Sequence, residues 1–126
     1  MTWQGAVAIA AGGALGALAR YGVGTWVAAR WGTTFPWGTL LINVTGSLLL
    51  GLFSAWYVRR TGLPLELRLF VAVGFCGAYT TFSTFALDTV TLAQAGQVSA
   101  SLSNALLTNA LCLAAALLGV FVGSRL

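Results

Sequence analysis

Four long, nearly uncharged apolar stretches dominate the sequence and restrict what the chain can fold into. They extend from about Trp3 to Ala29, from Trp37 to Val58, from Leu65 to Ala93 and from Val98 to Val122. A helix needs roughly 20 mostly apolar residues to cross the hydrocarbon core of a bilayer. Only 6% of the residues are charged, far fewer than in a water-soluble domain. The sequence therefore predicts an all-α membrane protein, a single domain over residues 1–126 with four transmembrane helices in the cell (inner or plasma) membrane.

The connections and charges predict how these helices are arranged. Short connections favour antiparallel neighbours. No basic segment precedes the first apolar stretch, so we expect it to stay in the protein as a span rather than to be removed as a signal peptide. Arg59, Arg60, Arg68 and Arg125 fall on the side of the N-terminus, and Arg30 falls on the other. The positive-inside rule then predicts that both termini lie in the cytoplasm.

Polar uncharged residues recur at helical spacing inside three of the predicted spans. The stripes are Thr39, Asn43 and Ser47 on the second span, Thr81, Phe82, Phe85 and Asp88 on the third, and Ser101, Asn104, Thr108 and Cys112 on the fourth. Hydroxyls and amides avoid lipid, so these faces are expected to contact protein or water. Hydrogen bonds between helices explain a single stripe of this kind. Three stripes in four helices favour a hydrated path.

The third span is expected to be broken. Between Gly74 and Thr84 it combines glycine with β-branched and hydroxyl residues, which are poor helix formers. The composition predicts a break near Gly77–Thr81. Freed carbonyls at membrane depth would suit a cation, and freed amides with hydroxyls would suit an anion, so the pattern leaves both open. Four helices of this size do not enclose a pore alone, so any transport pathway requires an oligomer.

The sequence contains no arrangement typical of an enzyme. It has no histidine and no glycine-rich phosphate loop, and its two carboxylates, Glu66 and Asp88, belong to different environments. Cys76 and Cys112 lie in apolar runs without other soft ligands, which favours buried thiols over a disulfide or a metal site. The net charge of +4 comes from scattered arginines, which predicts no nucleic-acid partner.

Three motifs resemble those of the Fluc (CrcB) fluoride channels. They are Gly-Ala-Leu-Ala-Arg20-Tyr21 in the first span, Trp37-Gly-Thr-Leu-Leu-Ile-Asn43-Val-Thr-Gly46 in the second, and Gly-Ala-Tyr-Thr80-Thr-Phe82-Ser-Thr-Phe85 in the third. The resemblance extends over the chain in length, number of spans and order of motifs. It implies an antiparallel, dual-topology homodimer with two pores, through which fluoride leaves the cytoplasm passively.

The same resemblance implies roles for individual residues. The implied fluoride pathway consists of the pore phenylalanines Phe82 and Phe85, the amide of Asn43, the hydroxyls of Ser83, Thr84 and Thr108, and the vestibule arginine Arg20, with Asn104 and Cys112 as further members of the fourth-span track. The family also holds a central structural sodium ion, here through the backbone carbonyls of Gly77 and Thr80 from both subunits. Amide and hydroxyl donors can replace the water around fluoride, and aromatic ring edges carry partial positive charge. Asp88 receives no role.

Two other functions are compatible with four short helices. A small multidrug/proton antiporter can also form dimers, but it needs a membrane-embedded carboxylate, usually in the first span. This chain has Arg20 there, and Asp88, late in the third span, is its only candidate. An accessory subunit without transport activity is the other alternative, in which the polar stripes only hold helices together.

Overall fold

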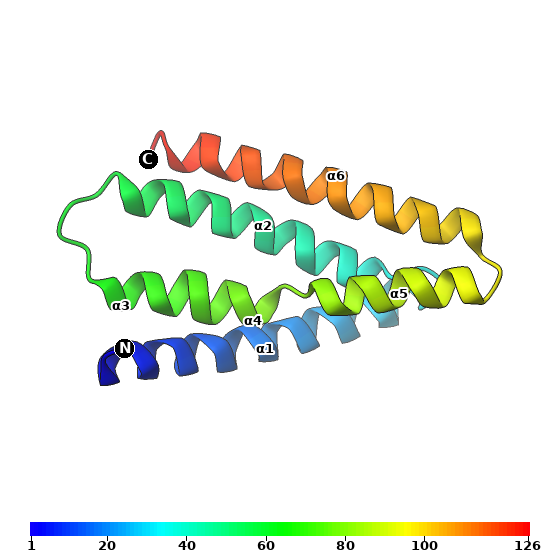
Figure 1. Ribbon diagram of the computed structural model, residues 1–126, viewed down its shortest axis with the longest axis horizontal. Coiled ribbons are helices and arrows are strands. Elements are labelled where there is room, and N and C mark those ends of the chain that lie inside the picture. Colours follow the sequence, from blue (N-terminus) through cyan, green and yellow to red (C-terminus); the bar gives the residue numbers. More distant parts are fainter.

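The computed structural model describes residues 1–126 as a bundle of helices (Figure 1). The first two spans are α1 (Trp3–Trp31) and α2 (Trp37–Val58), and the last is α6 (Val98–Gly123). The third span, Leu65–Gln94, consists of α3 (Leu65–Arg68), a π-helix η1 (Leu69–Cys76), α4 (Gly77–Tyr79) and α5 (Phe82–Gln94). All four spans are long and apolar enough to cross a membrane, which confirms the predicted set. Each begins at the predicted residue and ends within two residues of the predicted end.

The surface of the bundle is apolar because few side chains are covered within one copy. Only 20 of the 126 residues are buried, and the exposed ones include large aliphatic and aromatic side chains on every span. A water-soluble protein does not expose so much contiguous apolar surface. The predicted all-helical membrane protein is therefore confirmed, and lipid or another protein surface must cover these helices.

Close helix contacts in the bundle depend on glycine. α2 packs along α6, and α1 packs along η1 (Figure 1). Gly12 and Gly16 lie where α1 meets the backbone of η1, and Gly119 and Gly123 lie where α6 meets the backbone of α2. A Cβ atom at any of these four positions would overlap a carbonyl oxygen of the neighbouring helix. These two Gly-x-x-x-Gly pairs therefore set the distances between the helices.

The break of the third span predicted near Gly77–Thr81 is present, and two threonines at the end of that range form it. Thr80 and Thr81 have extended backbone angles (φ −80°, ψ 157° and φ −151°, ψ 107°). Thr81 then caps α5, because its Oγ1 accepts a hydrogen bond from the Thr84 N–H at 3.2 Å. Gly77 has helical angles, and Gly74 serves close packing, because a Cβ there would lie only 2.7 Å from a carbonyl oxygen of α1.

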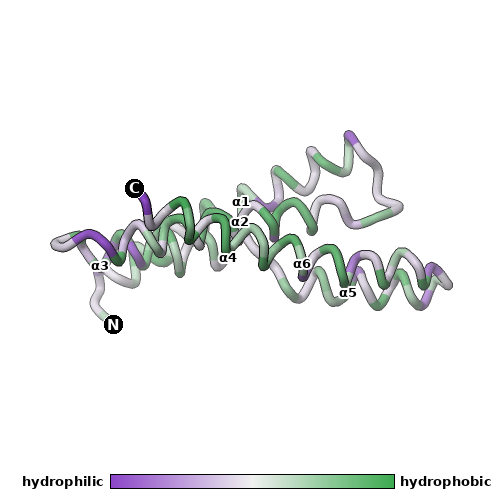
Figure 2. The backbone as a smooth tube through the Cα atoms, turned by 90° about the horizontal axis from the view of Figure 1, so that it is seen from above, coloured by the Kyte–Doolittle hydropathy of each residue, from purple (hydrophilic) through white to green (hydrophobic).

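The bundle divides at one end. Figure 2 shows α1, α2 and their connecting loop turning away from α5 and α6. The opposite end, with both chain termini and α3, stays together (Figure 1). One part of the candidate site is lined by the diverging helices α1, α2 and α5.

Candidate functional site

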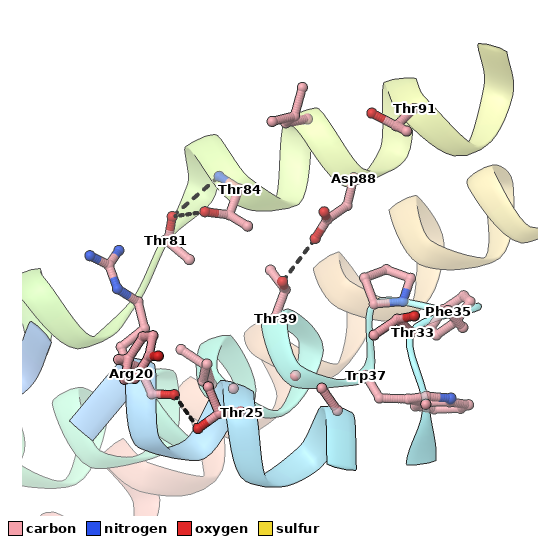
Figure 3. Close-up of a pocket in the computed structure, with 18 of the residues that line it drawn as sticks. Arg20, Thr25, Thr33, Phe35, Trp37, Thr39, Thr81, Thr84, Asp88 and Thr91 are labelled. Atoms are coloured by element: carbon pink, nitrogen blue, oxygen red, sulfur yellow. Dashed lines mark hydrogen bonds between the residues drawn. The ribbon is translucent and has the colours of Figure 1, made fainter. Parts of the chain in front are cut away.

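A cavity of about 650 Å³, here called the outer cavity, lies where α1 and α2 diverge from α5 (Figure 3). Its polar lining comes from three helices, the α1–α2 loop and the break: Arg20, Tyr21 and Thr25 on α1, Thr33 and Thr34 in the loop, Thr39 on α2, Thr81 at the break, and Thr84, Asp88 and Thr91 on α5. Figure 3 shows Arg20 at the end of the cavity near the break and Asp88 farther along α5. The outer cavity thus contains one cationic and one acidic side chain at different depths.

Asp88 is bound by the facing helix. The Thr39 hydroxyl donates a hydrogen bond to Asp88 Oδ2 at 2.8 Å (Figure 3). A carboxylate accepts only, so the threonine proton is used in this bond and is not offered to a ligand in the cavity. The pair therefore joins α2 to α5 in the lining of the outer cavity, in which Arg20 is the one cationic side chain.

A second cavity of about 320 Å³, here called the inner cavity, is lined by α2, α5 and α6 together with Thr80 at the break. The polar stripes of α2 and α6 meet the third span in its lining, which includes Asn43, Ser47, Thr80, Phe82, Phe85, Thr108, Asn109 and Cys112. The rings of Phe82 and Phe85 lie 5.4 Å apart and are tilted by 54°. Phe82 is 75% exposed, whereas Phe85 is 7% exposed. One copy of the chain therefore leaves this cavity open beside Phe82.

Asn43 joins the two cavities by replacing the hydrogen bonds that the broken helix lacks. Its Nδ2 donates to the Thr81 carbonyl at 3.0 Å, and its Oδ1 accepts from the Thr81 N–H at 2.7 Å. Asn43 lines the inner cavity and Thr81 the outer one, so the pair lies between them. Because an amide nitrogen carries two protons, Asn43 keeps one donor beyond its bond to Thr81.

The residues of the predicted fluoride pathway are divided between the two cavities. Arg20 and Thr84 line the outer cavity. Phe82, Phe85, Asn43, Thr108 and Cys112 line the inner cavity. Ser83 lines neither, and is exposed at the start of α5. Asn104 also lines neither, because it is 1% exposed between α5 and α6.

Several residues of the site had no predicted role. Ser47 and Thr39 belong to the predicted stripe of α2 without a role implied by resemblance. Thr81 could have been identified as a helix cap, because a threonine hydroxyl at the start of a helix can accept from the backbone N–H three residues later, here that of Thr84. Asn109 follows Thr108 directly and lies off the predicted stripe, so helical spacing gave no signal for it.

The backbone at the break has carbonyl oxygens available to a cation. In an unbroken α-helix the Gly77 carbonyl would accept from the Thr81 N–H, but that N–H donates to Asn43. The Thr80 carbonyl accepts no backbone hydrogen bond. Unwound backbone carbonyls of this kind coordinate Na⁺ in membrane proteins. The two carbonyls predicted to hold sodium therefore fit such an ion chemically.

Comparison with known proteins relates this arrangement to one family. Residues 7–120 match the family described as CrcB-like protein, Camphor Resistance (CrcB), a range that includes every residue lining the two cavities. The chain is 52% identical over 101 residues to "Fluoride-specific ion channel FluC 1" of Nitrobacter hamburgensis, covering 80% of each chain. It is 49% identical over 118 residues to "Fluoride-specific ion channel FluC 2" of Symbiobacterium thermophilum, covering 94% of this chain and 93% of the relative. It is 48% identical over 109 residues to "Fluoride-specific ion channel FluC" of Koribacter versatilis, covering 86% of each.

Proposed function

The chain belongs to the CrcB-like protein, Camphor Resistance (CrcB) family, and from that premise we propose that it is a fluoride-specific ion channel of the cell (inner or plasma) membrane. Fluoride would leave the cytoplasm through it passively. The observation that carries the proposal is the inner cavity, where an amide, a hydroxyl and two phenylalanines from three helices line one space.

The chemistry of that lining suits a small anion. Fluoride is strongly hydrated, so a narrow route must replace its water with hydrogen-bond donors. Asn43 retains one amide proton, and Thr108 carries a hydroxyl. Phe82 and Phe85 are tilted relative to each other, so the partially positive edge of one ring can be presented to an ion beside the other. Cys112 adds only a weak donor.

The outer cavity supports a role as an anion vestibule. Arg20 is always charged and raises the local concentration of anions near the break. Asp88 would oppose this, but it lies farther along α5 and its Oδ2 accepts the hydroxyl of Thr39. Thr84 lies between these two charges in the cavity lining and offers a further hydroxyl (Figure 3). The expected path runs from Arg20 past Thr84 to Asn43.

A second copy of the chain is part of the proposal. Phe82 is largely exposed and the inner cavity is open beside it, so one copy does not enclose a route. In an antiparallel, dual-topology homodimer, each copy would cover the open cavity of the other, which would create two pores. The Gly77 and Thr80 carbonyls of both copies would hold a structural sodium ion between them, where its charge would compensate the exposed carbonyl dipoles.

A multidrug/proton antiporter is not favoured. Its chemistry needs a carboxylate deep in the membrane, and α1 contains none. The chain has two acidic residues. Glu66 lies in the short helix α3, and Asp88 lies on α5, where it accepts a hydrogen bond from Thr39. No acidic side chain lines the inner cavity.

Ion flux from liposomes that contain the purified protein tests the proposal. We expect fluoride efflux without chloride efflux, independent of a proton gradient. Phe82→Ile and Phe85→Ile should each reduce that flux at least about tenfold, equivalent to about 1.4 kcal/mol of lost ion stabilisation. Phe121→Ile is the matched control, because Phe121 is exposed on α6 and lines neither cavity. Proton-coupled export of a cationic dye would instead identify an antiporter, and absence of any flux an accessory subunit.

A further inference from the structure

A chain of hydrogen bonds links α5 to the inner cavity through a side chain outside it. The Thr89 hydroxyl donates to the Phe85 carbonyl at 2.8 Å, and Asn104 Nδ2 donates to Thr89 Oγ1 at 2.9 Å. The Thr108 hydroxyl then donates to Asn104 Oδ1 at 3.3 Å. Asn104 is 1% exposed and lines neither cavity, whereas Thr108 lines the inner one.

The direction of every bond in this chain is fixed by chemistry. The Phe85 carbonyl can only accept, so the single hydroxyl proton of Thr89 must be used there. Thr89 Oγ1 therefore accepts from its other neighbour, which must be the amide nitrogen of Asn104. This sets the orientation of the carboxamide and turns its oxygen toward Thr108. The proton of the Thr108 hydroxyl consequently points at Asn104, away from the cavity.

This orientation matters for an anion in the inner cavity. A hydroxyl whose proton is directed elsewhere presents only lone pairs, which repel fluoride. The bond from Thr108 to Asn104 is long at 3.3 Å, since O–H···O bonds usually span 2.5–3.0 Å. Its proton can therefore turn to an arriving anion at small cost.

From this geometry we infer that Asn104 is a positioning residue of the ion pathway, which competes with the anion for the Thr108 proton. The inference rests on the proposed channel function and specifies how one donor is regulated there. Asn104 weakens the hold of the site on fluoride, and weak binding lets an ion leave as readily as it enters. Removing the competing oxygen should let fluoride bind more tightly and pass more slowly at saturation.

The test measures fluoride efflux from liposomes as a function of fluoride concentration. Asn104→Ala should lower the half-saturating concentration about threefold, the effect expected of losing one weak hydrogen bond, here between two side chains of α6. Ser101→Ala is the matched control, because Ser101 donates to the Thr89 carbonyl at 2.8 Å and also ties α6 to α5, but has no bond to Thr108. It should leave the half-saturating concentration unchanged.

A double-mutant cycle separates positioning from packing. Combined with Thr108→Val, which has no hydroxyl, Asn104→Ala should no longer shift the half-saturating concentration. A shift of the same size in both backgrounds, or an equal shift in Ser101→Ala, would overturn the inference. If Asn104→Ala does not fold, Asn104→Ser tests the same point, because the shorter side chain loses its reach to Thr108 while retaining a polar group. Failure of the unaltered protein to conduct fluoride would refute the proposed function instead, so the two outcomes are distinct.

Discussion

Replacing Asn43 by alanine should destabilise the break and reduce ion flux together. The substitution removes both hydrogen bonds to Thr81, one through its N–H at 2.7 Å and one through its carbonyl at 3.0 Å. Polar contacts between membrane helices contribute about 0.6 kcal/mol on average and at most about 1.7 kcal/mol, so the two bonds together are expected to contribute about 1 to 3 kcal/mol. Both Thr81 groups lie in a buried, unwound segment without a helical partner. The loss of stability should therefore lie toward the upper end of that range.

Unfolding of the purified protein in detergent, followed by circular dichroism against rising denaturant, measures the loss. Asn109→Ala is the matched control, because Asn109 lines the same cavity but bonds only to the Ala105 carbonyl of its own helix at 2.7 Å. It should change the free energy of unfolding by less than about 0.5 kcal/mol. If Asn43→Ala were as stable as the natural chain, Asn43 would not be the substitute for the missing backbone bonds, and the assignment of the break would be wrong.

Other predictions concern packing and the charges of the outer cavity. Gly119→Ala should destabilise the bundle by about 1–3 kcal/mol, because the new methyl group would overlap the α2 backbone, whereas Gly22→Ala, with nothing within 4 Å, should not. Arg20→Gln should reduce fluoride entry roughly tenfold at low ionic strength and less in high salt, measured by efflux at subsaturating fluoride. Asp88→Asn should raise entry under the same conditions, and an effect of the same sign as Arg20→Gln would contradict the vestibule. Thr39→Val removes the hydroxyl that binds Asp88, and fluoride entry should then stay unchanged or fall.

The spans and the position of the break were predictable from the sequence, but the side chain that holds the break was not. Hydropathy fixes where a helix can cross a bilayer, so the spans begin where expected. The break was predicted from glycine together with β-branched and hydroxyl residues, and of these only the threonines at positions 80 and 81 have extended angles. At Gly74, however, neighbouring α1 uses the missing side chain for close approach, and tertiary packing outweighs propensity. The extended residues are Thr80 and Thr81, and Thr81 is bonded to Asn43, a residue 38 positions away.

The polar stripe on α6 shows what helical spacing cannot determine. Ser101, Asn104, Thr108 and Cys112 share one face, as predicted. In the structure the first two bond to Thr89 on α5, whereas the last two line the inner cavity. One part of this face contacts α5 and the other part lines the cavity. The boundary between them is the point where contact with α5 ends, which the break in the third span sets. Periodicity identifies the face but not this division.

A substitution at Gly77 tests whether a second copy of the chain binds, because it should not disturb the fold of one copy. A Cβ on Gly77 would have only the Ala72 carbonyl oxygen nearby, at 3.9 Å, and Gly77 is exposed in one copy, so a larger side chain can extend away from the helices. If a partner covers this face, Gly77→Leu should weaken association while leaving the helices intact. Gly22→Leu is the matched control, because Gly22 also has open space around it. Light scattering in detergent measures the mass, and cross-linking in membranes checks it. A dimer equally stable in both variants would mean that this face is not an interface, and the proposed sodium site between two copies would be lost with it.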